Sequence, residues 1–136
     1  MPDISNIYKL TRHYNYDNLP STATVKMNTC NKNHKITVSM REDGDLDVNI
    51  VSDCKNVQEY AKNINVIGMS DLMDRHSSKI LDPSNSAMLS TPCLVQQGVL
   101  DAAWMEVGIL SKSLCNKVHS NEVILDQMNP DTDEQS

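Results

Sequence analysis

Three short stretches in the first half of the chain alternate apolar and polar residues with a period of two. The apolar positions are Val25 and Met27, then Ile36, Val38 and Met40, then Leu46, Val48 and Ile50. A period of two with one apolar face is typical of a half-buried antiparallel sheet. The pattern therefore predicts a three-stranded antiparallel meander.

The same alternation restricts the second hairpin, because residues directly opposite each other share a face of the sheet. A two-residue loop of Asp43 and Gly44 would place an inward-pointing residue of one strand opposite an outward-pointing residue of the other. A three-residue loop over 43–45, with Gly44 in a left-handed conformation, avoids this conflict. In that register Val38 lies opposite Ile50.

The first hairpin must have a loop of even length for the same reason. We predict that Met27 pairs with Ile36, which leaves Cys30 in the loop between the strands. The predicted register also places Ile36 opposite Ser52. The Cys30 loop and the corner that leads to Cys54 should therefore lie at the same end of the sheet.

After the third predicted strand, the apolar residues recur at the spacing of a helix. Ser52 or Asp53 is a suitable N-cap for a helix that includes Cys54. The apolar face of this helix consists of Val57, Tyr60, Ala61 and Ile64. A short helix is predicted from Ser70, and residues 77–90 are predicted to be a loop or a weak helix.

The longest helix is predicted to begin with Thr91 as its cap and Pro92 at its first position. Its apolar stripe consists of Val95, Val99, Ala103, Val107 and Leu110, widened by Leu100 and Trp104. A helix of this length would carry Cys115 about 30 Å from Cys93, at ~1.5 Å per residue. Residues 118–125 are predicted to be an extended segment that can add a fourth strand.

These elements predict an α+β fold, in which an antiparallel sheet is covered on one face by helices. We divide the chain into an N-terminal arm over residues 1–20, a single domain over 21–127 and a disordered acidic tail over 128–136. The length of 136 residues suits one domain with one core.

The amino-acid composition argues against some classes of binding partner. The net charge of −6 argues against nucleic acid and against anionic membranes as the main partners. No apolar run approaches the ~18 residues needed to span a bilayer, and residues 1–20 lack the apolar core of a signal peptide. The expected location is therefore cytoplasmic, where cysteines are free thiols or metal ligands rather than disulfides. A protein partner and the oligomeric state are left open.

Three of the four cysteines carry the candidate chemistry. Cys30 lies in a predicted turn, and Cys54 and Cys93 each open a predicted helix. Free N–H groups at a helix N-terminus stabilise a thiolate, so Cys54 and Cys93 are expected to ionise readily. Thiolates suit zinc, copper(I) or an iron–sulfur cluster. His34, beside the Cys30 loop, is the candidate fourth ligand.

The stretches NTCN, SDCKNVQEYA and TPCLVQQGVLDAAWMEVG resemble a small prokaryotic family of domains of unknown function. The resemblance covers about residues 22–126. It implies the α+β fold and a shared set of three thiols, to which Cys30, Cys54 and Cys93 correspond. Cys115 has no counterpart in the resemblance.

The order of these cysteines is also similar to that of U-type iron–sulfur cluster scaffold proteins, with one cysteine in a hairpin loop and two at helix starts. The chain departs from that pattern in three ways. Asn31 and Lys32 stand where the scaffolds have Gly-Asp, Pro92 stands where they have His, and the proline-rich chaperone-binding segment is missing.

Two functions from different classes are compatible with this pattern. The first is a binding protein that holds a metal ion, for example zinc, or an iron–sulfur cluster through Cys30, Cys54 and Cys93, with His34 as the candidate further ligand. The alternative is a non-catalytic interaction or structural domain whose cysteines are buried and unligated, since Cys often behaves as a small apolar residue. A thiol-redox or cysteine enzyme ranks third, because only His34 could serve as a nearby base.

Overall fold

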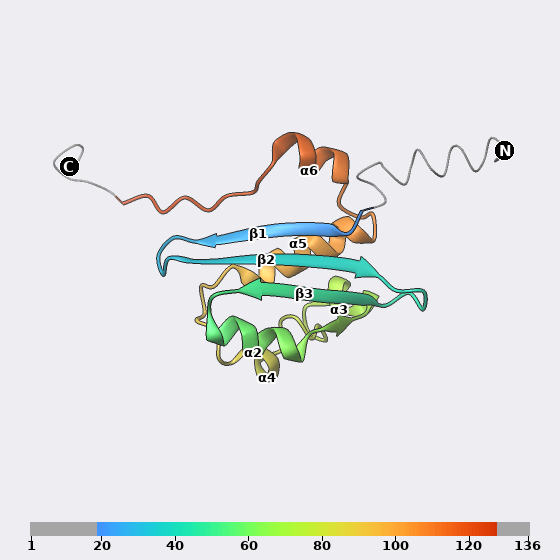
Figure 1. The fold of residues 1–136 in the computed structure, drawn as a ribbon, viewed down its shortest axis with the longest axis horizontal. Helices are drawn as coiled ribbons and strands as arrows, with labels where there is room; N and C mark the ends of the chain where they lie inside the picture. Colours follow the sequence, from blue (N-terminus) through green and yellow to red (C-terminus); the bar gives the residue numbers. More distant parts are fainter. Residues whose placement is uncertain (1–18, 128–136) are drawn as a thin grey trace.

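The computed structural model describes residues 19–127 and builds them around a twisted antiparallel sheet (Figure 1). The strands are β1 (Ser21–Met27), β2 (Lys32–Met40), β3 (Leu46–Ser52) and the short β4 (Val66–Ile67), in the spatial order β1-β2-β3-β4. All neighbouring pairs are antiparallel. The predicted α+β fold is therefore confirmed. The predicted arm over 1–20 lies almost wholly outside the described residues, as does the tail over 128–136.

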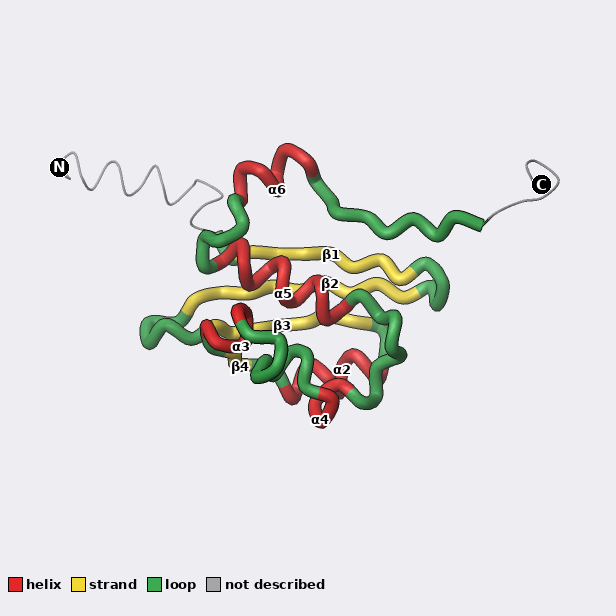
Figure 2. The backbone as a smooth tube through the Cα atoms, turned by 180° about the vertical axis from the view of Figure 1, so that it is seen from behind, coloured by secondary structure: helices red, strands yellow, loops and turns green. Residues whose placement is uncertain are grey.

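Helices cover one face of the sheet (Figure 2). These helices are α2 (Lys55–Asn63), α3 (Met69–Met73), α4 (Pro83–Ser86) and α5 (Val95–Glu106). A further helix, α6 (Lys112–Val118), lies beyond the β1 edge of the sheet. The helix α5 packs across β1 and β2, and α2 packs against β3. Within residues 19–127, no helix is both long enough and apolar enough to cross a membrane.

The core lies between the sheet and the helices. Its largest fully buried side chains include Tyr60, Ile36, Leu46, Ile64 and Ile67. The hydroxyl of Tyr60 donates to the carbonyl of Ile80 at 2.8 Å, so the one polar atom of this buried ring has a partner. The predicted apolar stripe of α2 is thus the face that forms the core.

Close approach of α5 to the sheet depends on Gly98. A Cβ at this position would lie 2.5 Å from Cγ2 of Val25 and 2.6 Å from Cδ1 of Ile36. Such distances are far below van der Waals contact, so only glycine lets the helix reach this depth without movement of its neighbours.

The faces of the strands were predicted correctly, but the register of the first hairpin was not. Met27 lies opposite Lys32, not Ile36, and Val25 lies opposite His34. The loop is a turn of four residues, 28–31, and is therefore even in length, as predicted. Asn31 takes the left-handed conformation (φ 57°) that closes this tight turn, a conformation that Asn tolerates better than most residues.

The partner of Met27 thus differs by four residues from the prediction, and the register of the second hairpin is shifted by two. Val38 lies opposite Val48 rather than Ile50, and the backbone N–H of Arg41 donates to Asp45 O at 2.7 Å. The three-residue loop is therefore 42–44 and not 43–45. Gly44 has φ of +92°, which confirms the predicted left-handed conformation.

The starts of both main helices differ from prediction. The N-cap of α2 is Cys54 and not Ser52 or Asp53. The helix α5 is capped by Leu94 and not by Thr91, so Cys93 precedes the helix instead of opening it. Residues 90–93 form a turn, in which the Cys93 N–H donates to Ser90 O at 3.0 Å.

The long helix is also shorter than predicted. Helix α5 ends at Glu106, and Gly108, with φ of +84°, turns the chain toward the separate helix α6. Cys115 lies in α6 and not at the end of one long helix that begins near Cys93. Residues 119–127 form no strand, and the fourth strand is β4 beside β3.

Candidate functional site

One end of the sheet gathers three segments that are distant in sequence. They are the turn 28–31, the corner 52–54 and the segment 90–94 before α5; together they are called the thiol end. Cys30 is exposed on the first of these, and its Sγ donates a weak hydrogen bond to Met27 O at 3.7 Å. The thiol of Cys30 is thus turned back toward its own hairpin.

The corner after β3 is fixed by a cross-strand pair. His34 lies opposite Ser52, and its Nδ1 hydrogen-bonds to Ser52 Oγ at 2.8 Å. The same hydroxyl oxygen accepts the backbone N–H of Cys54 at 2.9 Å. Ser52 therefore positions both a buried imidazole and the half-buried thiol at the start of α2.

The segment before α5 is held by a short turn and by a sulfur atom. The N–H of Cys93 donates to Ser90 O at 3.0 Å. The N–H of the next residue, Leu94, donates to the thioether Sδ of Met27 at 3.4 Å. The start of α5 is thereby attached to the end of β1, beside the Cys30 turn.

These three segments enclose a cavity of about 200 Å³ at the thiol end. It is lined by Cys30, Lys32, His34, Cys54, Asn56, Val57, Leu89, Ser90 and Cys93. All four residues predicted as site residues thus border one space. Cys115 does not line it, in agreement with the prediction that it stands apart.

Electrostatics at Cys93 contradict the expectation of a readily formed thiolate. Burial raises the pKa of the Cys93 thiol, and the neighbouring thiols of Cys30 and Cys54 raise it further, while a hydrogen bond from the Val95 backbone lowers it. Desolvation exceeds the stabilisation by the helix N-terminus, because Cys93 is half-buried and lies before the first turn of α5.

His34 is kept neutral by its surroundings. Burial lowers the pKa of its imidazole, and the carboxylate of Asp53 opposes this shift. A neutral imidazole is the form that can ligate a metal ion. The bond between Nδ1 and Ser52 leaves Nε2 as the nitrogen without an assigned partner among the described contacts.

The donor atoms are gathered but not arranged as a finished metal site. Among residues 19–127, no group of three or more His, Cys, Asp or Glu side chains is placed so that it could hold a metal ion. The orientation of Cys30 toward Met27 O accounts for part of this result. By residue type, three thiols and one imidazole match a known ligand set of zinc.

Sequence reasoning missed two groups at this end. The buried Met27 accepts the Leu94 N–H through its sulfur atom. Lys32 lines the cavity while its Nζ donates to Asp53 O at 3.4 Å. Both follow from the four-residue turn, which the two flanking asparagines at 28 and 31 could have indicated.

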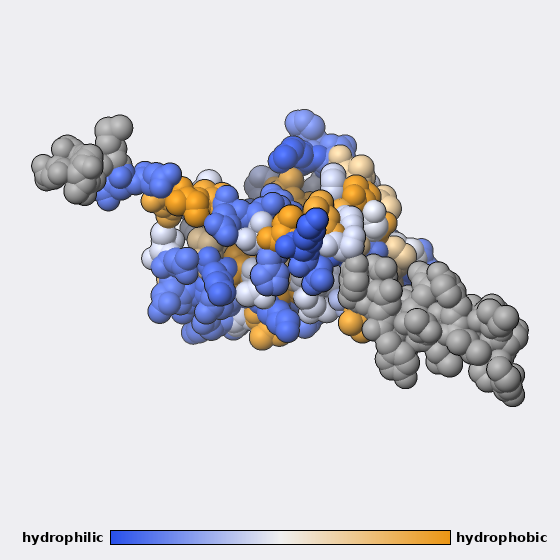
Figure 3. Space-filling view, turned by 90° about the horizontal axis from the view of Figure 1, so that it is seen from above, coloured by the Kyte–Doolittle hydropathy of each residue, from blue (hydrophilic) through white to orange (hydrophobic). Residues whose placement is uncertain are grey.

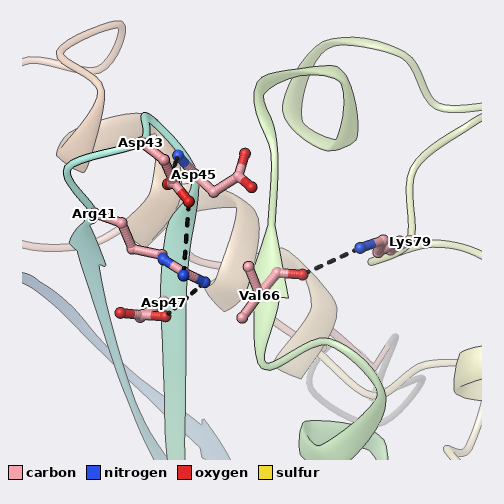
Figure 4. Close-up of polar contacts among 6 residues, drawn as sticks. All are labelled: Arg41, Asp43, Asp45, Asp47, Val66 and Lys79. Atoms are coloured by element: carbon pink, nitrogen blue, oxygen red, sulfur yellow. Dashed lines mark hydrogen bonds and ion pairs between the residues drawn. The ribbon is translucent and has the colours of Figure 1, made fainter.

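The opposite hairpin carries carboxylates around Arg41 (Figure 4). Arg41 lies between Asp43 and Asp47, at 3.6 and 3.8 Å, and all three side chains are exposed. Nearby, Lys79 Nζ donates to Val66 O at 3.3 Å. Exposed pairs of this kind contribute little to stability and indicate a solvated hairpin tip.

Taken together, these features define an α+β domain with a thiol-lined cavity at one end of its sheet. Residues 21–118 match the family described as a family of unknown function, DUF6951. The chain belongs to this family, because the match covers well over half of its length. Neither the curated proteins nor the solved structures contain a match to the chain.

Proposed function

We propose that the protein binds a thiophilic metal centre, a zinc ion or an iron–sulfur cluster, through Cys30, Cys54 and Cys93. The observation that carries the proposal is the single cavity bordered by all three thiols. Three thiols around one cavity give no packing benefit that aliphatic side chains would not provide better. Their convergence from three separate segments therefore favours a shared ligand.

The fourth position belongs to His34 in this proposal. Its imidazole is neutral, buried and oriented by Ser52, which is how metal-binding histidines are commonly held. A zinc ion would complete a tetrahedral set of three thiolates and one nitrogen. An iron–sulfur cluster would use the same thiolates, and the similarity in cysteine order to cluster scaffolds supports that variant.

Two local changes would complete the site. Cys30 must rotate about χ1 away from Met27 O, which exchanges one staggered rotamer for another on an exposed turn. Cys93 must lose its proton, which its raised pKa resists until a cation is present. Metal binding should therefore release protons and become tighter as pH rises.

The test uses the full chain, purified anaerobically and treated with a chelator. Titration with zinc, and with cobalt(II) as a spectroscopic probe, should give one metal ion per chain and thiolate-to-metal absorption. Cys30→Ser, Cys54→Ser and Cys93→Ser should each weaken binding by at least tenfold. Cys115→Ser is the matched control and should bind as the parent chain does. Iron and sulfide content after anaerobic reconstitution separates the cluster from the single ion.

Alkylation provides an independent readout. Added metal should protect Cys30, Cys54 and Cys93 from a thiol reagent and should leave Cys115 unprotected, because coordination occupies the sulfur lone pairs. Absence of stoichiometric metal, together with labelling that is unchanged by zinc or iron, would refute the proposal. The interaction domain with unligated cysteines would then be the better description.

A further inference from the structure

The C-terminal part of the described chain exposes an unusual amount of apolar surface. Residues 119–127, called the C-terminal arm, form no helix or strand and lie away from the core. Three consecutive side chains in this arm, Val123, Ile124 and Leu125, are 70%, 65% and 73% exposed. Figure 3 shows apolar side chains at the surface on this side of the molecule. Three adjacent apolar residues in water are a liability unless something covers them.

The sheet offers a surface that such a segment can cover. β1 lies at the end of the strand order and pairs only with β2 among the described elements, so its outer edge has N–H and C=O groups without strand partners. Natural sheets usually shield an edge of seven residues by charge, by a bulge or by another strand. Along β1 the only charged side chain is Lys26.

We propose that the C-terminal arm of one chain pairs as an added antiparallel strand with the outer edge of β1 in a second copy. The alternation of the arm fits this role. Val123 and Leu125 share one face, and the polar Glu122 and Asp126 share the other with Ile124. A strand with this pattern would extend the apolar face that α5 covers.

One register of the C-terminal arm against β1 pairs apolar residues on the inward face and opposite charges on the outward face. The inward side chains of β1 are at odd positions, so Val123 can lie opposite Val25 and Leu125 opposite Ala23. This register places Glu122 directly opposite Lys26 on the outward face. Cross-strand pairs of opposite charge stabilise a sheet, and the one cation of β1 is thereby matched by an anion of the arm.

The direction of the arm favours pairing with β1 of a second copy over pairing with β1 of the same chain. Figure 1 shows the arm leaving α6 in the same general direction as β1, which is the wrong sense for antiparallel pairing within one molecule. A two-fold axis perpendicular to the sheet reverses that direction in the partner. Each chain then donates its arm and accepts the other, which gives a closed symmetric dimer.

The test measures the mass of the full chain by light scattering and sedimentation, with a reductant and a chelator present so that neither disulfides nor metal can join the copies. We expect a dimer at micromolar concentrations. The double variant Val123→Asp with Leu125→Asp should weaken dimerisation by at least 100-fold. Circular dichroism serves as the control for folding, because the arm makes no contribution to the core.

A charge swap tests the register itself. Lys26→Glu or Glu122→Lys alone should raise the dimer dissociation constant about tenfold, since two cross-strand pairs become repulsive. The two changes combined should restore it to within about twofold. A parent chain that stays monomeric overturns the proposal, as does a dimer insensitive to the arm substitutions. Failure of the double swap to rescue refutes the stated pairing. None of these results depends on whether the thiol cavity binds metal.

Discussion

The polar groups at the two ends of the sheet differ in how fully the protein satisfies their hydrogen bonds. At the end away from the thiols, the Glu106 side chain is only 13% exposed. It accepts from the Ser21 hydroxyl and from the Met40 N–H, both at 2.9 Å, and lies 3.6 Å from Lys112 Nζ. At the thiol end, the sulfur atoms of Cys30 and Cys93 have weak or single partners.

The difference distinguishes polar groups that hold a fold together from polar groups that are available to a ligand. A buried carboxylate without partners is costly, so Glu106 must be satisfied within the protein itself. A thiol is weakly polar and can be buried with little hydrogen bonding at small cost. The thiol end can therefore remain chemically available without destabilising the domain.

The largest effect should follow from Glu106→Ala, which removes the acceptor shared by Ser21 and Met40 and leaves Lys112 without this carboxylate. We expect a loss of about 3 kcal/mol in the free energy of unfolding, measured by urea denaturation. Glu106→Gln should lose less, because the amide oxygen can still accept one bond. Alkylation rates at the thiol end should not change in the folded variant. A loss below about 1 kcal/mol would contradict the structural role assigned here to Glu106.

An intermediate effect is expected from Gly98→Ala, which acts near the thiol end. The added methyl group would collide with Val25 and Ile36, at a cost that exceeds the gain in helix propensity, for a net loss of about 1–2 kcal/mol. Because Cys93 lies directly before the N-cap of the displaced helix, Cys93 should also become more reactive to alkylation. The exposed neighbour in the same helix, Gln97→Ala, is the control and should leave both quantities unchanged. Equal stability of the Gly98 and Gln97 variants would show that α5 has room to move.

The smallest effect concerns the pH dependence of the metal-free protein. The pKa of His34 is lowered in the folded state by burial, so below a pH of about 6.5 the unfolded chain binds a proton more readily than the folded one. Stability should therefore fall as pH decreases through this window. Denaturation across the window should show a shallower slope for His34→Gln than for the parent chain. A parent chain whose stability rises with acidification would contradict the prediction.

The two-residue period of the strands explains both the success and the failure of the strand predictions. Alternation assigned every strand to the correct face, but it cannot distinguish registers that differ by two residues. The first hairpin was misplaced by four residues and the second by two, both even shifts. For the first hairpin, the turn residues Asn28 and Asn31 held the missing information. Because an even shift moves neither loop to the other end of the sheet, Cys30 and Cys54 still came together.

The helix starts were harder to predict for a different reason. Thr91 and Pro92 form a sound capping signal, yet the chain continues for two residues before α5 begins at Val95. Contact between Leu94 and Met27 decides that start, and no local pattern shows a contact across 67 positions. The end of α5 was predictable, because Gly108 is a common helix terminator.

The sulfur contact between Met27 and Leu94 also bears on how the protein tolerates peroxide. Methionine oxidises to a bulky, polar sulfoxide according to its access to solvent. Met27 is buried, whereas Met40, Met69 and Met73 are about half exposed. Those surface side chains should consume oxidant first, which delays damage at the residue on which the start of α5 depends.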